Sequence, residues 1–320
     1  MVQTSIKKLN RTICIGLGGT GKDVLMRIRR LIVDRYGSLD NLPIVSFVHI
    51  DTDRNAAQSS SLSTGNTYHG VDISLTNAEK VVANMNALQV TNFVEELEKK
   101  STNNRRGPYD HIALWFPPDL LPDIKAIEEG AKGIRPVGRL AFFYNYMNIK
   151  DTLEKAETRT RGHEAKLLRN LGITVESGLN IFVVGSVCGG TGSGMFLDIA
   201  YSLRKHYGND NTSIIGYLLI SPKLYGNTPI MRANTYAALK ELNHYSIPGN
   251  KFTACYDQQH QIIVNESRPP FDYTYLISDE KIGQGESKIL DIRQLYNVIA
   301  HKIALEFSGD LAASVKGMRD

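Results

Sequence analysis

A glycine-rich stretch at residues 188–194, CGGTGSG, constrains the fold of this 320-residue chain more than any other segment. It follows an apolar run at 181–184 that has the composition of a buried strand, and it precedes residues 195–203, whose apolar positions have helical spacing. Glycine lets another group approach the backbone closely, and the free N–H groups of a helix N-terminus attract anions. The stretch therefore predicts a phosphate-binding loop with Thr191 and Ser193 as additional hydroxyl donors; the alternative is a tight turn with incidental glycines.

A second glycine-rich segment, GLGGTGKD at residues 16–23, also separates an apolar strand (12–15) from a helix with apolar spacing. Its glycines match the dinucleotide fingerprint, with Asp51 at the end of the next strand as an acidic ribose ligand. They also match most of the P-loop pattern, in which Asp23 stands where a Ser or Thr should hold magnesium. The segment alone does not choose between these interpretations and a third, given below.

Composition bounds the class of protein. With 42% hydrophobic residues the chain can bury the core of one large α/β domain or two smaller ones, and a net charge of +4 gives no clear nucleic-acid signature. Three cysteines and eight histidines show no metal-ligand spacing, so no metal site is predicted and a reducing compartment is expected. The N-terminus lacks a signal-peptide pattern, and no apolar run reaches the roughly 20 residues that span a bilayer. We expect a soluble cytoplasmic protein.

Residues 188–194 resemble the signature loop of the tubulin/FtsZ superfamily, Gly-Gly-Gly-Thr-Gly-Ser/Thr-Gly, with Cys188 in place of the first glycine. Residues 16–23 are similar to the first phosphate loop of that family, which is the third interpretation of the segment. Asp51-Thr52-Asp53 resembles the family's Asn-Thr-Asp at the end of the second strand. We name residues 16–23 the first loop and residues 188–194 the signature loop.

Residues 129–141, EGAKGIRPVGRLA, resemble the γ-phosphate loop of FtsZ, and we name residues 129–138 the third loop. Lys132 replaces a glycine there. Lys132, Arg135 or Arg139 could meet a phosphate, and the alternative for each is a surface charge. Arg232 fits an arginine that FtsZ places after its fifth strand, whereas Thr228 stands where the family has a ribose-contacting glutamate. Asp279 follows the sixth expected strand, where the family presents an asparagine to guanine.

The last helix, at about 290–307, resembles the family's central core helix, and Asn297 is the base-reading candidate because an amide matches the donors and acceptors of guanine. The resemblance, which covers most of residues 12–307 and is to bacterial tubulin-like proteins, implies GTP or GDP with Mg²⁺ as the ligand. The nucleotide-binding residues expected in the loops are Gly18, Gly19, Thr20, Gly21, Lys22, Asp51, Asp53, Gly130, Ala131, Lys132, Gly133, Gly138, Gly189, Gly190, Thr191, Gly192, Ser193 and Gly194.

The expected fold is α/β: a doubly wound, mainly parallel sheet with helices on both faces, and a nucleotide across the carboxyl ends of the strands. Residues 54–108 are interpreted as an insertion with an amphipathic helix at 77–98, and 246–271 as a connection with a short hairpin. The expected strands are 12–15, 44–50, 111–116, 181–184, 213–220 and 273–277.

The resemblance implies a GTP-binding domain at 1–308 and, at 309–320, the start of a connection to an absent activation domain. It also implies a GTPase that assembles head to tail into cytoskeletal filaments, or a nucleotide-gated scaffold; the alternative is an NAD- or FAD-binding oxidoreductase. In the family, acidic residues of the neighbouring subunit complete the hydrolytic site, and Asp310 and Asp320 are the stand-ins available in this chain. We therefore expect GTP binding with slow hydrolysis.

Overall fold

The computed structural model describes residues 7–55, 65–103, 110–117, 119–120, 124, 126–279, 291–306 and 317. Within this part of the chain, six parallel strands form the central sheet in the order β10-β7-β6-β1-β2-β5. The predicted α/β class, with its parallel sheet, is confirmed. The strand bounds are β1 Lys7–Leu17, β2 Val45–Asp51, β5 Lys80–Val82, β6 Ile173–Ser186, β7 Thr212–Leu219 and β10 Tyr273–Ile277.

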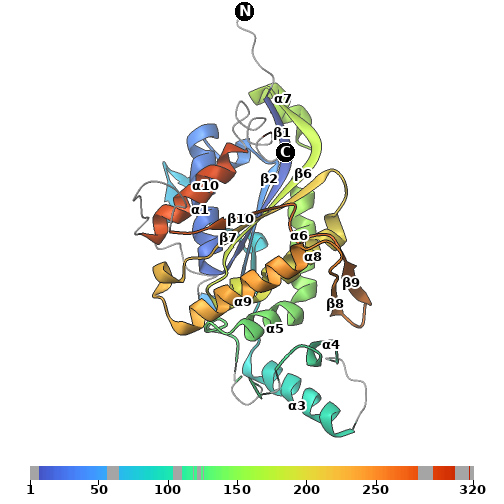
Figure 1. The fold of residues 1–320 in the computed structure, drawn as a ribbon. Helices are drawn as coiled ribbons and strands as arrows, with labels where there is room; N and C mark the ends of the chain where they lie inside the picture. The colour runs from blue at the N-terminus through green and yellow to red at the C-terminus, as the bar shows by residue number, and fades with distance from the viewer. Residues whose placement is uncertain are drawn as a thin grey trace, which may run out of the picture.

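Helices cover both faces of the sheet (Figure 1). On one face α1 packs against α10, and on the other α5, α6, α8 and α9 enclose the larger core. Successive side chains of β1 point to opposite faces of the sheet and so enter two different cores. Ile13 and Ile15 enter the larger core, and Cys14 enters the core under α1. The helix bounds are α1 Gly18–Tyr36, α5 Arg135–Tyr144, α6 Tyr146–Arg159, α7 Glu164–Leu171, α8 Gly190–Tyr207, α9 Pro229–Ser246 and α10 Ile292–Leu305.

Smaller elements complete the described chain. The predicted hairpin is present as β8 (Phe252–Asp257) and β9 (Ile262–Glu266), and its Phe252, Tyr256 and Val264 join the larger core. No helix in the described residues is long and apolar enough to cross a lipid bilayer. The remaining elements are η1 Leu39–Asn41, β3 Thr67–Tyr68, β4 Val71–Asp72, η2 Asn77–Glu79, α3 Ala87–Asn103, α4 Asp110–Ala113 and η4 Pro222–Tyr225.

The helix predicted at 77–98 is wrong in its first half. Residues 77–79 form η2, residues 80–82 form edge strand β5, and helix α3 begins only at Ala87. Val81 lies in register with Ile50 of β2, and Met85 makes an isolated bridge to Ile127. These apolar residues fit helical spacing, but the unpaired edge of β2 offers main-chain hydrogen bonds that local spacing does not reveal.

The strand predicted at 111–116 is also wrong. Residues 110–113 form the short helix α4, and a turn follows it. The strand that pairs with the outer edge of β2 is β5. Ile112 and Phe116 are buried four residues apart while Leu114 is 85% exposed, which is the pattern of a helical turn rather than of a buried strand. Phe116 packs edge-to-face on Phe93 of α3, and both helices lie at one end of the molecule, beyond α5 (Figure 1).

Candidate functional site

The first loop and the signature loop meet at the carboxyl edge of the sheet. β1 and β6 are neighbours in the sheet; β1 ends at Leu17 and β6 at Ser186, and helices α1 and α8 begin within four residues of those ends. A Cβ atom placed on Gly18 would lie 3.6 Å from Cβ of Thr191, so the two loops are in contact. Carboxyl edges of parallel sheets are where α/β proteins place their ligands.

Neither of these two helices has a side-chain cap in the described structure. The residues before them, Leu17 and Gly189, make no capping hydrogen bond, and neither first turn contains an acidic residue. The first N–H groups of an α-helix have no partner within the helix, and the helix dipole adds partial positive charge there. Two such N-termini side by side have the electrostatics of an anion site.

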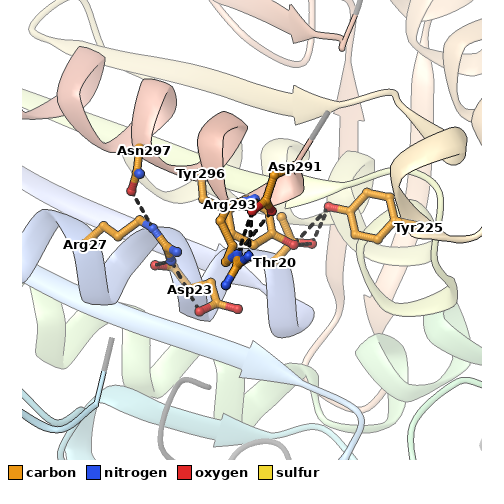
Figure 2. A network of polar contacts seen from close by, with 8 residues as sticks. All are labelled: Thr20, Asp23, Arg27, Tyr225, Asp291, Arg293, Tyr296 and Asn297. Atoms are coloured by element: carbon orange, nitrogen blue, oxygen red, sulfur yellow. Dashed lines mark hydrogen bonds and ion pairs between the residues drawn. The ribbon is translucent and has the colours of Figure 1, made fainter. Parts of the chain in front are cut away.

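A cavity of about 140 Å³ lies between these helix starts, and we name it the loop cavity. It is smaller than the roughly 300–1,000 Å³ of whole small-molecule pockets. On one side Tyr225 Oη lies 2.6 Å from Thr20 Oγ1, and both hydroxyls lie within 3.4 Å of the Tyr296 hydroxyl of α10 (Figure 2). The cavity is lined by Leu17, Gly18, Gly19, Thr20, Ser186, Gly189, Gly190, Thr191, Gly192, Tyr225 and Met231.

The glycines of the motifs divide into two kinds. A Cβ on Gly19 or Gly189 would meet no described atom within 4 Å, so these two line open space. In contrast, a Cβ on Gly192 would collide with the Ser186 carbonyl oxygen, and one on Gly190 would lie 2.8 Å from Cβ of Ala131. The sequence interpretation assigned all of them to ligand approach, whereas Gly190 and Gly192 are also required by the packing of the chain on itself.

Other glycines belong to the packing kind as well. A Cβ on Gly138 would collide with the carbonyl oxygen of Gly190, and one on Gly194 would lie 2.5 Å from the carbonyl oxygen of Arg135. These contacts bring α5 and α8 together at their N-terminal turns. A Cβ on Gly21 would similarly press on Gly16, so this pair seats α1 against β1.

Two buried side chains hold the third loop against the signature loop. Thr52 Oγ1 lies 2.6 Å from Thr191 Oγ1 and accepts a hydrogen bond of 3.0 Å from Ala131 N–H. Asn234 of α9 donates to the carbonyl oxygens of Gly133 (2.7 Å) and Cys188 (3.0 Å). Sequence reasoning missed both roles. Thr52 was visible only as the residue between two acidic candidates, and nothing in the local sequence marks Asn234.

The charged side chains Lys132 and Arg135 of the third loop, and Arg139 directly after it, lie outside the lining of the loop cavity. Exposed Lys132 pairs with Glu129 at 3.3 Å. Arg139 pairs with Asp198 at 2.9 Å, and Asp198 is buried, so the ion pair neutralises a carboxylate that would otherwise be costly to bury. Arg135 pairs with Glu241, and both arginines line a separate groove of about 480 Å³ among α5, α8 and α9. Neither Arg135 nor Arg139 lines the loop cavity, so contact of either residue with a phosphate stays a prediction.

The hydroxyls of the signature loop are engaged within the protein. Ser193 is buried and its hydroxyl donates to the carbonyl oxygen of Gly189, one turn back. The Thr191 hydroxyl is bonded to Thr52, although Thr191 still lines the cavity. Of the two predicted hydroxyl donors, only Thr191 therefore borders the space that a ligand would enter.

A buried polar cluster lies beneath the first loop. His49 is fully buried in β2, and its Nε2 lies 3.2 Å from the carbonyl oxygen of Gly18 and 3.7 Å from Asp51 Oδ2. Burial lowers the pKa of His49 to about 4 and raises the pKa of Asp51 to about 6. Lys22 is also buried, which lowers its pKa, and the nearby Asp51 charge acts in the opposite direction. Nothing in the sequence indicates a role for His49, because this residue stands within an apolar run that predicts only a strand.

The same geometry bears on the two enzyme interpretations of the first loop. A ribose ligand in a dinucleotide site must present its carboxylate at the surface, but Asp51 is 3% exposed, and its Oδ1 accepts a hydrogen bond from Asp53 N–H. Asp23, where a P-loop needs a hydroxyl, accepts a hydrogen bond from Arg27. Neither arrangement supports those interpretations.

Of the predicted residues that the structure describes, Gly18, Gly19, Thr20, Gly189, Gly190, Thr191 and Gly192 line the loop cavity, and the others, including the candidates for the ribose and the base, lie outside its lining. Asn297 is exposed on α10, and its Oδ1 accepts a hydrogen bond of 2.7 Å from Arg27 Nε (Figure 2). Arg232 is exposed on the first turns of α9, and Asp279 N–H donates to Ser221 Oγ after β10. Thr228 caps α9 by accepting from Met231 N–H. The acidic stand-ins Asp310 and Asp320 lie outside the described residues.

Comparison with known proteins finds one matching family and several similar solved structures. The model of a family described as "Tubulin like" matches residues 13–320, and no curated protein matches the chain. Among solved structures, CetZ from Methanosaeta thermophila matches with a TM-score of 0.51 at 15% identity, over 94% of this chain and 54% of that one. A GTPγS-bound protofilament of CetZ2 from Haloferax volcanii matches with a TM-score of 0.47 at 14% identity, over 92% and 57%.

This chain thus spans little more than half the length of those solved chains. At such identities the likeness to the Methanosaeta protein shows the fold alone. The family model covers nearly the whole sequence, including all three glycine loops. The chain therefore belongs to the tubulin-like family.

Proposed function

We propose that this protein binds a guanine nucleotide with its phosphates in the loop cavity. The observation that carries the proposal is the convergence of two uncapped helix N-termini on a cavity where Gly19 and Gly189 present no side chain. Backbone N–H groups in this arrangement suit phosphate oxygens, and the hydroxyls of Thr20 and Thr191 border the same space. Guanine as the base follows from the resemblance to the tubulin/FtsZ superfamily.

The resemblance implies a divalent cation bound with the phosphates. Asp53 at the end of β2 is half-buried, whereas Asp51 is 3% exposed and could contact the ion only if the first loop moved. Asp51 and Asp53 supply carboxylate oxygens, which are the ligands that Mg²⁺ prefers. With a pKa of about 6, Asp51 is mostly ionised at neutral pH. Magnesium, when bound, would neutralise charge on the phosphates, while Asp51 and Asp53 would orient it.

The sugar and base would extend from the loop cavity toward α10. Tyr225 borders that side of the cavity, its hydroxyl lies 3.4 Å from that of Tyr296, and Asn297 follows Tyr296 on α10 (Figure 2). For the base to pass, the contact between the Tyr225 and Thr20 hydroxyls must open. Asn297 is then the base-reading residue of the proposal, Asp279 is the second candidate, and Arg232 is the candidate contact near the ribose.

Nucleotide hydrolysis and self-association complete the proposal. In phosphoryl transfer most of the rate enhancement comes from positioning and electrostatic stabilisation. The loop cavity would hold the phosphates, and acidic residues of a second copy would position the attacking water at a head-to-tail contact, as the resemblance implies. We propose a GTPase of this kind acting in cytoplasmic filaments.

Calorimetry on nucleotide-free protein tests the binding step. We expect GTP to bind at least 100-fold more tightly than ATP, and NADH not to bind. The base of any nucleotide that co-purifies should be guanine. Equal affinity for GTP and ATP, or binding of NADH, would contradict the proposal.

A phosphate-release assay across a protein concentration series tests hydrolysis. If a second copy completes the site, the specific activity rises steeply as molecules associate. Because Asp310 and Asp320 are the only stand-ins identified for the acidic residues of a second copy, we expect the 320-residue chain by itself to bind GTP but to release phosphate slowly and with little dependence on concentration. A steep rise for this chain would show that it already assembles a competent site between copies.

A further inference from the structure

We propose that His49 is a positioning residue that turns the Gly18–Gly19 peptide so that its N–H group faces the bound phosphate. The inference rests on the proposed nucleotide binding and adds a residue outside the glycine loops to that site. His49 does not line the loop cavity; it lies in β2, beneath the start of α1, and acts through the backbone of the first loop.

The register of the sheet brings His49 to the first loop. His49 is paired with Gly16 of β1, and residues paired across neighbouring strands point to the same face. A Cβ on Gly16 would lie 2.7 Å from the backbone of Gly21, so α1 rests directly on β1 at this point. The close approach places the carbonyl oxygen of Gly18 3.2 Å from His49 Nε2.

The direction of the hydrogen bond follows from chemistry. A carbonyl oxygen can only accept, so Nε2 carries the proton and donates it to Gly18. The other ring nitrogen is Nδ1. This atom is buried and has no hydrogen-bond partner among the described residues.

An unsatisfied buried nitrogen costs stability, on the order of 1–3 kcal/mol, relative to a partnered one. A hydrophobic side chain of similar size would avoid that cost in the same place. Stability of the sheet alone therefore does not account for a histidine here, whereas a need to hold the Gly18 carbonyl does.

Peptide geometry gives the consequence for the cavity. The described backbone contains no cis peptide bond, so the carbonyl and N–H groups of each peptide point in opposite directions. With the Gly18 carbonyl directed inward at His49, the N–H of Gly19 points outward, and Gly19 is exposed at the loop cavity. Because glycines flank this peptide on both sides, side chains do not restrain its rotation, and the His49 hydrogen bond adds to the backbone of α1, which begins at Gly18, in fixing it.

Asp51 and Lys22 lie beside His49 beneath the first loop. Asp51 Oδ2, 3.7 Å from His49 Nε2, lies on the inner side of the loop, and Lys22 is buried in the same cluster. A flipped peptide would direct the Gly18 carbonyl oxygen into the cavity. It would then repel a phosphate, and the Gly19 N–H would be lost to the ligand.

The test compares His49→Phe, which keeps a ring but removes the donor, with His49→Gln, whose amide nitrogen can replace Nε2. GTP affinity is measured by calorimetry, the Gly19 amide resonance by ¹⁵N NMR, and stability by urea unfolding. In His49→Phe we expect GTP affinity at least tenfold weaker and a shifted Gly19 resonance, with urea stability equal to the wild type or greater. In His49→Gln we expect affinity within threefold of the wild type and a restored resonance.

A His49→Phe protein that binds GTP like the wild type, with an unchanged Gly19 resonance, would overturn the inference. If the phenylalanine variant does not fold, His49→Leu takes its place, with the same expectations. If the wild type itself binds no GTP, the proposed function fails separately. The Gly19 resonance then still decides the role of His49, because a shift in the donor-free variant that glutamine reverses supports it and an unchanged resonance refutes it.

Discussion

The first loop and the signature loop occupy neighbouring strand ends and begin similar helices, but different interactions hold them in place. In the signature loop, Gly190 and Gly192 admit other backbone segments at distances that no side chain allows. The first loop is held at Gly18 by a buried side chain, that of His49. Close glycine packing thus occurs in both loops, since Gly16 and Gly21 also pack on each other, and the first loop has a polar anchor, the His49 hydrogen bond, in addition. The number of glycines in such a motif therefore overstates how many approach a ligand, and the expected effects of substitution differ between the loops.

The largest effect is expected for Gly192→Ala. The new methyl group would collide with the Ser186 carbonyl oxygen, which belongs to the strand and cannot move aside freely. We expect the free energy of unfolding to fall by about 3 kcal/mol or more. Urea unfolding measures it, with Gly189→Ala as the matched control, expected to change it by less than about 0.5 kcal/mol. Equal losses in the two variants would show that the two kinds of glycine do not differ.

Asp51→Asn changes a buried carboxyl that lies 3.7 Å from His49 beneath the first loop. Burial raises the pKa of Asp51 from 3.8 to about 6, so the unfolded chain loses this proton more readily. The stability that the protonated carboxyl contributes is present below pH 3.8 and is lost as pH rises to about 6. Removing the charge should therefore raise the free energy of unfolding by about 3 kcal/mol at pH 7.5.

His49, Lys22 and Asp53 also act on Asp51, so wild type and variant are compared by urea unfolding at each pH between 4 and 7.5. The stability difference should shrink steadily toward pH 4. A constant difference across the series would mean that the gain has another cause than the carboxylate charge.

Gly189→Val should weaken ligand binding without disturbing the packing of the protein. Gly189 has φ −88° and ψ 177°, which a β-branched residue adopts readily, and its Cβ direction is open among the described residues. We expect a normal urea midpoint and at least 30-fold weaker GTP binding, about 2 kcal/mol, by calorimetry. Gly37→Ala, remote from the cavity at the end of α1, serves as a binding control. Unchanged affinity in Gly189→Val would remove the loop cavity from the proposal.

The smallest effect is expected outside both loops, at Asn297. Its carboxamide accepts a hydrogen bond from Arg27, which also lies over the Tyr296 ring at 5.3 Å. If the amide reads guanine, Asn297→Ala should weaken GTP binding by about 1 kcal/mol and leave residual ATP binding nearly unchanged. Val298→Ala, at a neighbouring exposed position of α10, is the control. Equal losses for GTP and ATP would make Asn297 a purely structural partner of Arg27.

Local sequence determined most of the architecture. Apolar runs identified β1, β2, β6, β7 and β10, and glycine loops follow β1 and β6. The runs are nearly continuous in β2, β6 and β7 because a strand buried on both faces must be apolar along nearly all its length. The same junctions identified the two loops that border the loop cavity, and Gly19, Thr20, Gly189 and Thr191 were among the residues predicted there. These features depend on neighbours within a few residues along the chain.

Tertiary structure decided what depends on distant residues. Val81 joined a strand because the edge of β2 was available, whereas residues 110–113 form a helix and β5, not residues 111–116, lies beside β2 in the sheet. Arg135 and Arg139 find their ion-pair partners tens of positions away along the chain. The contacts of His49 and Thr52 likewise involve distant residues. A buried polar group requires a partner, but the sequence does not state which distant group will supply it, since only the packed fold brings the two together.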